Sequence, residues 1–519
     1  MDSSRAVKHV VILGGGSAGW LTAAVLAADH DAASGGGLKV TLIESPDVAT
    51  IGVGEGTWPT MRDTLRRTGV TETDFLRECD GAFKQGSKFA RWTEDHDDDY
   101  YYHPFVLPQG YLETNVVAGW MKHSQVPFGK LVSFQPHLCE AGKAPKQFST
   151  PEWAAVANYS YHLDAGKLGV FMRKHCVERL GVRHVSDHMT GVNAHDNGDI
   201  ASLQTRDHGA IEGDLFIDCT GMRALLIGQH YGIEIQSQKH VLFNDRAIAL
   251  QVPYADPRQE IACQTISTAQ SSGWVWDIGL QTRRGVGHVY SSTHTTDEAA
   301  ADELMRYVKA TGGREQDIYT LPRITIRPGY RPKSWHRNCL AIGLSSGFME
   351  PLEASSLVLV ELAAGMLSDQ LPATRSDMDI VATRYNDAFQ YRWERVVDFL
   401  KLHYVLTKRI DSDYWRDNCR PESIPDRLKE LLQLWRHQPP SRYDLYRVEE
   451  VFPSASYQYI LYGMGFHPDL RPATRRMDDV ARAEGYFREA ADLTRKMLAA
   501  LPGHREMLDH VVTRGMPRL

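Results

Sequence analysis

His9-Val10-Val11-Ile12-Leu13-Gly14-Gly15-Gly16-Ser17-Ala18-Gly19-Trp20 joins an apolar run to a cluster of glycines and then to a segment rich in alanine and leucine. The apolar run predicts a buried strand, and the residues from Trp20 to Ala28 predict a helix. Gly14, Gly16 and Gly19 have the G-x-G-x-x-G spacing, in which missing side chains let backbone N–H groups approach a pyrophosphate. The stretch therefore predicts a dinucleotide site that includes Ser17 and Ala18, or else a glycine turn without a ligand.

A second strand completes a βαβ unit. Gly35-Gly36-Gly37 breaks the chain before the apolar run Lys39-Val40-Thr41-Leu42-Ile43, and Glu44 follows directly. A carboxylate at this point can accept hydrogen bonds from ribose hydroxyls and would repel a 2′-phosphate. We therefore expect an α/β fold that binds NAD or FAD rather than NADP.

The composition restricts the partners. The chain has 519 residues and a net charge of -7, which argues against nucleic acid or an anionic membrane as the main partner and favours a small molecule. Its seven cysteines are scattered without paired spacing, so we expect reduced thiols and no metal site. No apolar run approaches roughly 20 residues and no signal-peptide pattern follows Met1, so we expect a cytoplasmic location.

The rest of the chain alternates strands and helices before it becomes mainly helical. Residues 182–219 show short strand patterns with hairpin turns, and the chain returns to the nucleotide sheet at 214–221. Residues 95–102 have neither a helical nor a strand period and predict a loop or lid. From about Val358 the pattern is helical, with a later amphipathic helix over 473–501.

Three further motifs carry a resemblance to a known family. They are Ser345-Ser346-Gly347-Phe348-Met349-Glu350-Pro351-Leu352-Glu353-Ala354-Ser355-Ser356, Phe83-Lys84-Gln85-Gly86 and Gly273-Trp274-Val275-Trp276-Asp277-Ile278. Together with the opening glycines they resemble the flavin-dependent halogenases, the tryptophan halogenase group in particular. The resemblance implies an FAD-binding Rossmann-like fold of the glutathione-reductase and hydroxylase type, with a mixed β substrate region and a mainly helical C-terminal region. It implies an FAD module with the substrate sheet over residues 1–355 and a helical region over 356–519 that completes the substrate pocket.

The resemblance favours FAD over NAD. Ile51-Gly52-Val53-Gly54-Glu55-Gly56-Thr57-Trp58-Pro59 resembles the loop that passes the flavin in these halogenases, so Gly52, Val53, Gly54 and Glu55 are expected at the cofactor. Asp218-Cys219-Thr220-Gly221 resembles a later contact of two-domain flavoproteins. Gly343 and Leu344 stand where such folds bring the chain back toward the pyrophosphate and the ring.

The resemblance also assigns a catalytic pair. In the family a lysine and a glutamate hold and polarise hypohalous acid beside the substrate carbon, and the matching residues are Lys84 and Glu353. An ammonium group offers up to three donors, and a carboxylate can polarise the oxidant or remove the ring proton afterwards. Glu350 is the competing carboxylate, and we interpret it as structural.

Two more motifs concern the halide and the separation of substrate from flavin. Trp274 and Trp276 resemble the Trp-x-Trp-x-Ile-Pro motif whose tryptophans are thought to exclude the substrate from the flavin, although Gly279 replaces the proline. The halide is expected against N–H groups near Ser355 and Ser356, where the best-known members have Thr-Gly. Alternating tryptophans are otherwise simply one face of a strand.

The resemblance places the substrate on an aromatic shelf. His103, Pro104 and Phe105 resemble the residues on which these enzymes lay an indole ring, and stacking contributes about 0.5 to 1.5 kcal/mol per pair beyond burial. Ser456, followed by Tyr457, stands where tryptophan-specific members usually have a tryptophan for the opposite shelf. A wider pocket, with a natural substrate other than free tryptophan, is therefore left open.

These motifs together imply an FAD-dependent halogenase that uses reduced FAD (FADH2), O2 and a chloride or bromide ion on an indole or another electron-rich aromatic. No second G-x-G-x-x-G is present for a nicotinamide, so a separate flavin reductase is expected as a partner. An aromatic hydroxylase with the same fold is the first alternative, and a flavoprotein without turnover is the second. The natural substrate, the modified carbon, the preferred halide, delivery on a carrier protein and a homodimeric state remain open.

Overall fold

The chain folds into two units that each draw on three separate segments. The computed structural model describes residues 6–47, 54–316, 318, 320–445, 447, 450–471 and 478–518. Unit 1 comprises 1–81, 163–238 and 327–393, and unit 2 comprises 82–162, 239–326 and 394–519. The division of the chain into 1–355 and 356–519 stays a prediction.

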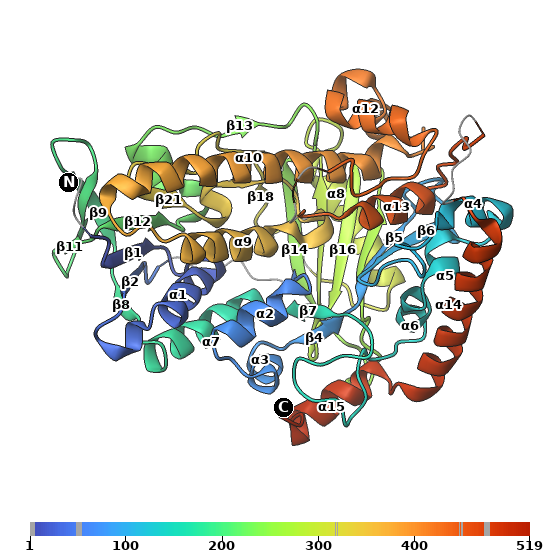
Figure 1. The fold of residues 1–519 in the computed structure, drawn as a ribbon, viewed down its shortest axis with the longest axis horizontal. Helices are drawn as coiled ribbons and strands as arrows, with labels where there is room; N and C mark the ends of the chain where they lie inside the picture. Colours follow the sequence, from blue (N-terminus) through green and yellow to red (C-terminus); the bar gives the residue numbers. More distant parts are fainter. Residues whose placement is uncertain are drawn as a thin grey trace. The chain divides into compact units, whose positions relative to one another are not determined.

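Unit 1 is built on a sheet with the strand order β20-β21-β12-β1-β2-β8. The central strand β1 (His9–Leu13) pairs in parallel with β2 (Lys39–Glu44) on one side and with β12 (Leu215–Asp218) on the other. Figure 1 shows β8, β2, β1, β12 and β21 as neighbouring strands. The remaining strands of the sheet are β8 (Arg183–Ser186), β20 (Trp335–His336) and β21 (Cys339–Ala341).

Helices cover this sheet, and α1 (Ser17–Asp29) packs against α7 and α9. The other helices of unit 1 are α2 (Thr60–Arg67), α3 (Glu72–Glu78), α7 (Ala165–Glu178) and α9 (Ser355–Asp369), with residues 375–393 of α10 (Arg375–Val405). Its smaller strands are β3 (Glu55–Gly56), β9 (Met189–Ala194), β10 (Ile200–Thr205), β11 (Ala210–Glu212), β13 (Gln236–Ser237), β19 (Gly329–Tyr330) and β22 (Gly347–Phe348).

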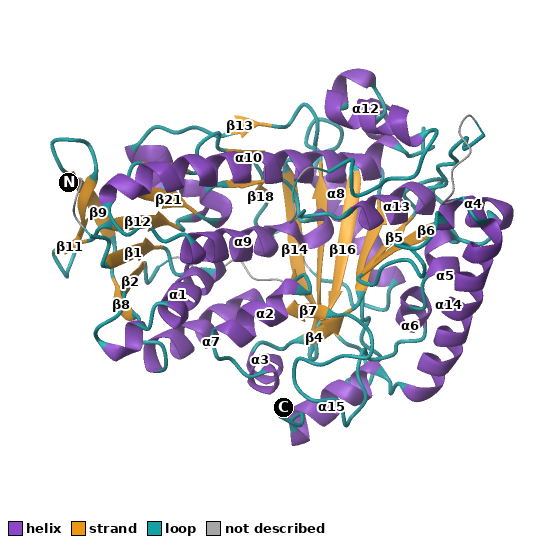
Figure 2. Cartoon of the chain, in the orientation of Figure 1, coloured by secondary structure: helices purple, strands orange, loops and turns teal. Residues whose placement is uncertain are grey.

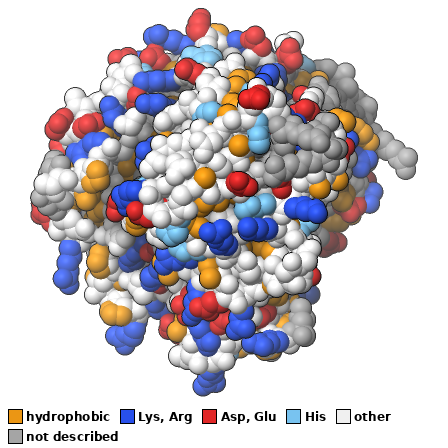
Figure 3. All heavy atoms as spheres, turned by 90° about the vertical axis from the view of Figure 1, so that its left-hand side faces the viewer, with side chains coloured by type: hydrophobic (Ala, Val, Ile, Leu, Met, Phe, Trp, Pro, Cys, Tyr) orange, Lys and Arg blue, Asp and Glu red, His pale blue; other side chains and the backbone are white. Residues whose placement is uncertain are grey.

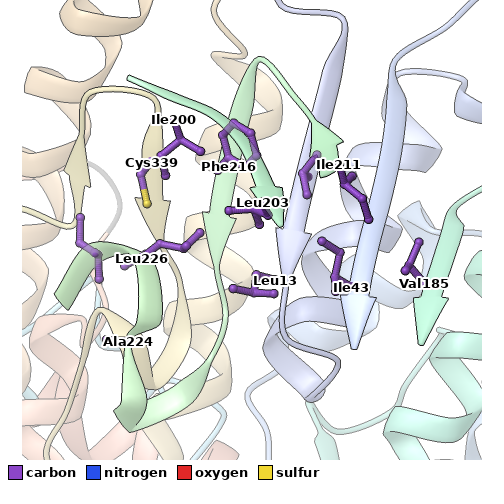
Figure 4. Close-up of a cluster of buried hydrophobic side chains, with 13 residues drawn as sticks. Leu13, Ile43, Val185, Ile200, Leu203, Ile211, Phe216, Ala224, Leu226 and Cys339 are labelled. Carbon is purple, nitrogen blue, oxygen red and sulfur yellow. The ribbon is translucent and has the colours of Figure 1, made fainter. Parts of the chain in front are cut away.

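A buried apolar core lies between the six-stranded sheet of unit 1 and the β9–β11 hairpins. Leu13, Ile43 and Phe216 come from β1, β2 and β12, and Leu203 comes from β10 (Figure 4). All four side chains have an exposed fraction of 4% or less. The predicted α/β class and the predicted βαβ unit are confirmed, and the core fixes the strand ends at which the glycine turn lies.

Unit 2 contains a mixed sheet with the order β18-β14-β17-β16-β15-β5-β6. Its strands are antiparallel neighbours except for β15 and β5, which pair in parallel. The strands are β5 (Gly86–Ala90), β6 (Tyr100–Pro104), β14 (Arg246–Pro253), β15 (Thr265–Ala269), β16 (Gly273–Gly279), β17 (Arg283–Tyr290) and β18 (Ile324–Thr325). A short strand, β4 (Ala82–Lys84), precedes β5 along the chain and pairs antiparallel with β7 (Ser160–Leu163), which follows β6.

Helices gather at the β6 edge of this sheet. Figure 2 shows α4, α5, α6 and α14 beside one another near β5 and β6, and α14 packs against the other three helices. The helices of unit 2 are α4 (Val116–Trp120), α5 (Phe128–Val132), α6 (Gln135–Glu140), α8 (Asp297–Ala310), α11 (Asp413–Asn418), α12 (Asp426–Trp435), α13 (Ser454–Gly463), α14 (Val480–Ala500) and α15 (His504–Arg514). The predicted helical C-terminal region is confirmed.

One prediction about secondary structure is wrong in part. The segment 95–102 was expected to be a loop, but Tyr100–Tyr102 belong to β6, whose residues pair with Ala90, Phe89 and Lys88 of β5. Three consecutive tyrosines hide the alternation of apolar and polar residues that indicates a strand. The pairing comes from a partner strand rather than from the local pattern.

The surface of one face is mixed in charge. Figure 3 shows lysine and arginine side chains interspersed with aspartate and glutamate side chains on this face. Within the described ranges, no helix combines the length and the apolar character that a membrane crossing requires.

Candidate active site

The glycine turn after β1 brings the start of α1 close to β12. Gly14 has a φ of +114°, and a Cβ on it would lie 2.3 Å from the carbonyl oxygen of Cys219. A Cβ on Gly19 would lie 1.9 Å from the carbonyl oxygen of Gly14. Gly16 precedes α1 without a side-chain hydrogen bond to its first turn, so the N–H groups at Ser17 and Ala18 have no side-chain cap. This arrangement fits a pyrophosphate at a helix N-terminus.

Glu44 ends β2 next to the same turn. Its Oε2 lies 3.0 Å from Nε2 of His184 and 3.8 Å from the guanidinium of Arg173. A Cβ on Gly15 would lie 2.2 Å from Cδ of Glu44, so only glycine leaves room for this carboxylate. The position of Glu44 fits a group that accepts hydrogen bonds from a ribose.

Two further predicted cofactor segments lie in unit 1. Gly343 has a φ of +74°, and a Cβ on it would lie 2.8 Å from Cβ of Ala18, which places the Gly343-Leu344 turn beside the start of α1. Ser345 Oγ donates a hydrogen bond to the carbonyl oxygen of Asp218, which ties this turn to the end of β12. Close backbone approach at Gly343 is what a dinucleotide needs there.

The predicted loop before α2 is described only from Gly54 onward. Gly54 has a φ of +159°, and Glu55 begins β3. Desolvation raises the pKa of the Glu55 carboxyl to about 7. Gly52 and Val53 lie outside the described residues.

A narrow cavity opens between the Gly343 turn and the start of α9. Its polar lining comes from Ser346, Ser355 and Ser356, and aromatic rings of α10 line the other side. The residue before α9, Ala354, makes no side-chain hydrogen bond to the first turn of the helix. The N-cap residue therefore offers no acceptor to the first N–H groups of α9, at Ser355 and Ser356, and the N-terminus of a helix favours an anion.

Glu353 lies two residues before this helix, in an unusual backbone conformation. It has φ +63° and ψ +5°, and its side chain is buried. Its carbonyl oxygen accepts a hydrogen bond from Nε1 of Trp58 at 2.7 Å. Glu350 is buried as well, so unit 1 has two buried carboxyl groups within four residues.

Lys84 lies in unit 2, at the end of β4. Its exposed fraction is 1%, and its Nζ lies 5.5 Å from the centre of the Phe105 ring. The preceding N–H group, that of Phe83, donates to Nε2 of His504 at 3.1 Å, and Nδ1 of His504 lies 2.9 Å from the carbonyl oxygen of Ile261. The imidazole therefore accepts at Nε2 and donates at Nδ1. Burial lowers the pKa of His504 to about 4, so this ring is neutral at pH 7.

The predicted shelf residues adjoin Lys84 through β5 and β6. Pro104 pairs with Gly86, and His103 precedes it on β6. Nε2 of His103 lies 2.8 Å from Oγ of Ser456, at hydrogen-bond distance. Unit 2 thus brings Lys84, the 103–105 segment and Ser456 into one neighbourhood.

Further rings of unit 2 complete this neighbourhood. The ring of Phe399 lies 5.8 Å from the ring of His103 and 4.9 Å from that of Tyr457. Phe105 N–H donates to Oε1 of Gln135 at 2.8 Å. These contacts fix the backbone and the rings of the candidate shelf.

Trp274 and Trp276 lie on β16, as predicted, and both side chains are buried. Their ring centres are 6.4 Å apart. A Cβ on Gly287 would lie 2.1 Å from Cζ2 of Trp276, so the indole lies directly against a glycine of β17. Gly279, the departure from the family proline, has no room for a Cβ, which would lie 2.8 Å from Cγ2 of Ile261.

Three residues of these sites were not assigned by sequence reasoning. Trp58 was quoted within a motif but received no role, and Gln135 and His504 belong to no motif. A side chain that forms a hydrogen bond with a backbone group far away in the sequence produces no local sequence pattern.

The fold and the glycine turns define a dinucleotide-binding protein of the α/β class, and comparisons with known proteins identify its family. The family model described as "Tryptophan halogenase" matches residues 9–479, so the chain belongs to the tryptophan halogenase family and is a flavin-dependent halogenase. The 7-chloro-L-tryptophan 6-halogenase KtzR of Kutzneria sp. (strain 744) is 33% identical over 96% of this chain and 98% of its own length. These matches do not favour the hydroxylase alternative.

Two solved structures extend the comparison. The crystal structure of a tryptophan halogenase from Shewanella frigidimarina NCIMB 400 is 46% identical, covers 99% of both chains and has a TM-score of 0.95. Xcc4156, a flavin-dependent halogenase from Xanthomonas campestris, is 31% identical, covers 99% of both chains and has a TM-score of 0.86. The fold of the family therefore extends over essentially the whole chain.

Proposed function

We propose that this protein halogenates an indole or another electron-rich aromatic compound with reduced FAD, O2 and chloride or bromide. The observation that carries the proposal is the amine of Lys84, which is 1% exposed and lies beside the Phe105 ring in the neighbourhood of His103 and Ser456. Removing an ammonium group from water costs free energy, so such a group is retained where it acts. Family membership supports halogenation as that action.

The residues of unit 1 fit FAD. The N–H groups at Ser17 and Ala18 are suited to the pyrophosphate, and Glu44 is suited to a ribose. The proposed contacts nearer the flavin ring come from two segments. They are Gly343 with Leu344, and Gly52, Val53, Gly54 and Glu55. Reduced FAD, when bound, supplies the activation of O2 that turns a halide into hypohalous acid.

The halide is proposed to bind at the start of α9. The N–H groups of Ser355 and Ser356 can donate to an anion there, because the N-cap residue, Ala354, has no side-chain acceptor for them. The positive end of the helix dipole favours a negative charge at the same point. The serine hydroxyls add two donors that Thr-Gly would not offer together.

Lys84 and Glu353 are the proposed catalytic residues. The ammonium group of Lys84 can donate a hydrogen bond to the oxygen of hypohalous acid, which increases the positive character of the halogen. The aromatic carbon then forms the carbon–halogen bond as the oxygen–halogen bond breaks, and a proton from the Lys84 ammonium group converts the departing hydroxide into water. Glu353 can accept the proton that the ring carbon loses, so the ring regains its aromaticity.

The aromatic substrate is proposed to lie on the shelf of unit 2. His103, Pro104 and Phe105 supply one side, and Ser456 and Tyr457 supply the other. Ser456 is hydrogen-bonded to His103 and has no ring that would fill the space. This favours a substrate that is larger than free tryptophan. The Trp274–Trp276 pair is proposed to exclude the substrate from the flavin.

The proposed cellular context has three parts. A separate flavin reductase supplies the reduced FAD, because the chain has no second nucleotide fingerprint. The location is the cytoplasm, where such a reductase and its nicotinamide are present. The proposed oligomeric state is a homodimer, which light scattering tests.

The test is a product assay with matched variants. The protein, a flavin reductase, FAD, chloride or bromide and a panel of aromatics are incubated, and products are examined by mass spectrometry for halogen isotope patterns. Lys84→Met is compared with Lys88→Met. In the unmodified protein the amine of Lys88, on β5, lies 4.2 Å from the centre of the Tyr100 ring on β6. Glu353→Gln is compared with Glu350→Gln. We expect Lys84→Met to lose halogenated product while it still binds FAD and consumes O2.

The controls define the contrary outcomes. Lys88→Met and Glu350→Gln should retain product formation if they fold. Full product formation by Lys84→Met would contradict the role of the lysine. Oxygenated products without halogen, from the unmodified protein, would contradict the proposed reaction as a whole.

A further inference from the structure

The backbone at Glu353 is strained. Glu353 has a φ of +63° and Ala354 has a φ of +54°, and both are in the left-handed region that non-glycine residues rarely adopt. Among the non-glycine residues with positive φ in the described part of the chain, they are the one consecutive pair. Such conformations persist only where the surrounding structure fixes them, and they cluster at functional sites.

The indole of Trp58 contacts this strained point. Nε1 of Trp58 donates to the carbonyl oxygen of Glu353 at 2.7 Å, across 295 residues of sequence. The N–H of Ala354 donates to the carbonyl oxygen of Pro351 at 3.0 Å and closes a turn around Glu353. The carbonyl of Glu353 is therefore oriented from outside the turn by one side chain.

A second attachment keeps the Trp58 segment against α9. Thr64 Oγ1 donates to Oε2 of Glu361 at 2.7 Å, and Thr60 Oγ1 lies 3.4 Å from Oε1 of the same carboxyl group. Glu361 lies on α9, and both threonines lie on α2, which begins two residues after Trp58. The segments 58–64 and 353–361 are thus joined at both ends, so the indole has little freedom to move away from the carbonyl.

We propose that Trp58 is a positioning residue that aims the carboxylate of Glu353, an inference that rests on the proposed function. The direction of the Cα–Cβ bond follows from the backbone, and a return of φ from +63° toward the ordinary helical value of about −63° would redirect it. The hydrogen bond from the indole opposes this return by holding the carbonyl. Trp58 therefore acts through Glu353 and is not itself a catalytic residue.

The test removes the indole N–H donor of Trp58 and keeps an aromatic ring at position 58. Trp58→Phe is one variant, and incorporation of 3-benzothienylalanine at position 58 is a second that keeps the bicyclic shape without an N–H. Trp120→Phe is the matched control, because Nε1 of Trp120 donates to a backbone carbonyl, that of Val126, at 2.9 Å in unit 2. FAD affinity, O2 consumption, KM for the aromatic and halogenated product per O2 are measured for each.

We expect both Trp58 variants to form product about tenfold more slowly, as the loss of one oriented hydrogen bond implies. FAD affinity and KM should stay within about twofold, so that product per O2 falls. Trp120→Phe should keep the product yield. Because Trp58 acts through Glu353, Trp58→Phe should have less than about a twofold further effect in a Glu353→Gln background.

The outcomes that overturn the inference are distinct from those that overturn the function. Equal product rates of the benzothienylalanine variant and the unmodified protein would show that the N–H does not position Glu353. So would an undiminished effect of Trp58→Phe in the Glu353→Gln background. Failure of the proposed function would instead appear in the unmodified protein, as the absence of halogenated product.

Discussion

Replacing Glu361 by glutamine should make the folded protein more stable at pH 8 than the unmodified protein, and nearly equal in stability at pH 4.5. Glu361 is 7% exposed. Desolvation raises the pKa of its carboxyl from 4.5 to about 8; the hydroxyls of Thr64 and Thr60 lower it and the charge of Asp63 raises it. The group is thus protonated in the folded chain under conditions in which the unfolded chain ionises it.

The sign and size follow from this difference in pKa. A carboxyl whose pKa is raised on folding contributes its full stability below pH 4.5, and this contribution is lost as the pH rises toward 8. The difference in pKa corresponds to roughly 5 kcal/mol over the whole interval. Glutamine keeps an oxygen for Thr64 and cannot ionise, so the Glu361→Gln variant should lack this loss.

The assay is urea unfolding at several pH values between 4.5 and 8.5. Glu361→Gln and the unmodified protein are compared with Glu212→Gln, which changes an exposed carboxyl group on β11. The free-energy difference between Glu361→Gln and the unmodified protein should grow with pH, and that of Glu212→Gln should not. Parallel curves for Glu361→Gln and the unmodified protein would refute the assignment of a protonated, buried carboxyl group.

Two further predictions concern the other ends of the site. Burial lowers the pKa of His504 to about 4, so its contribution to stability is complete above pH 6.5 and falls as the pH drops toward 4. His504→Gln keeps a neutral donor and acceptor. In urea unfolding at pH 4.5 it should reduce this loss of stability by roughly 3 kcal/mol. Gly19→Ala would bring a Cβ to 1.9 Å from a backbone oxygen, so we expect a loss of about 1 to 3 kcal/mol in stability and weaker FAD binding by fluorescence titration. Gly36→Ala, whose Cβ meets no atom within 4 Å, should keep FAD binding.

The elements with strong local patterns could be predicted from the sequence. Each of three elements has a periodicity or a composition that can be recognised in its own residues. They are the strand His9–Leu13, the helix after Gly16 and the apolar helix α9. The two tryptophans of β16 could be placed on a strand for the same reason. The candidate residues Lys84 and Glu353 came from resemblance, because a lone lysine indicates only surface charge and a glutamate before an apolar helix also fits the helix dipole.

The contacts that fix the site could not be predicted. Trp58 and Glu353 are 295 residues apart, and Phe83 and His504 are 421 residues apart. A backbone carbonyl or N–H group has the same chemistry at every residue, so nothing in the sequence marks the one that receives a distant side chain. The strand at Tyr100–Tyr102 was missed for a related reason, since its partner β5 supplies the pairing.

The positions of both proposed catalytic side chains depend on backbone that other residues of the same unit fix. In the strand of Lys84, the N–H of Phe83 donates a hydrogen bond to His504. In the turn of Glu353, the backbone carbonyl of Glu353 accepts a hydrogen bond from Trp58. In an oriented reaction a displacement of about 1 Å can cost on the order of 100-fold in rate. Residues that touch neither substrate nor cofactor can therefore control the product rate. Because such residues also stabilise the fold, their effect on catalysis is measured as the rate of halogenated product per molecule of folded protein, with the folded fraction determined separately.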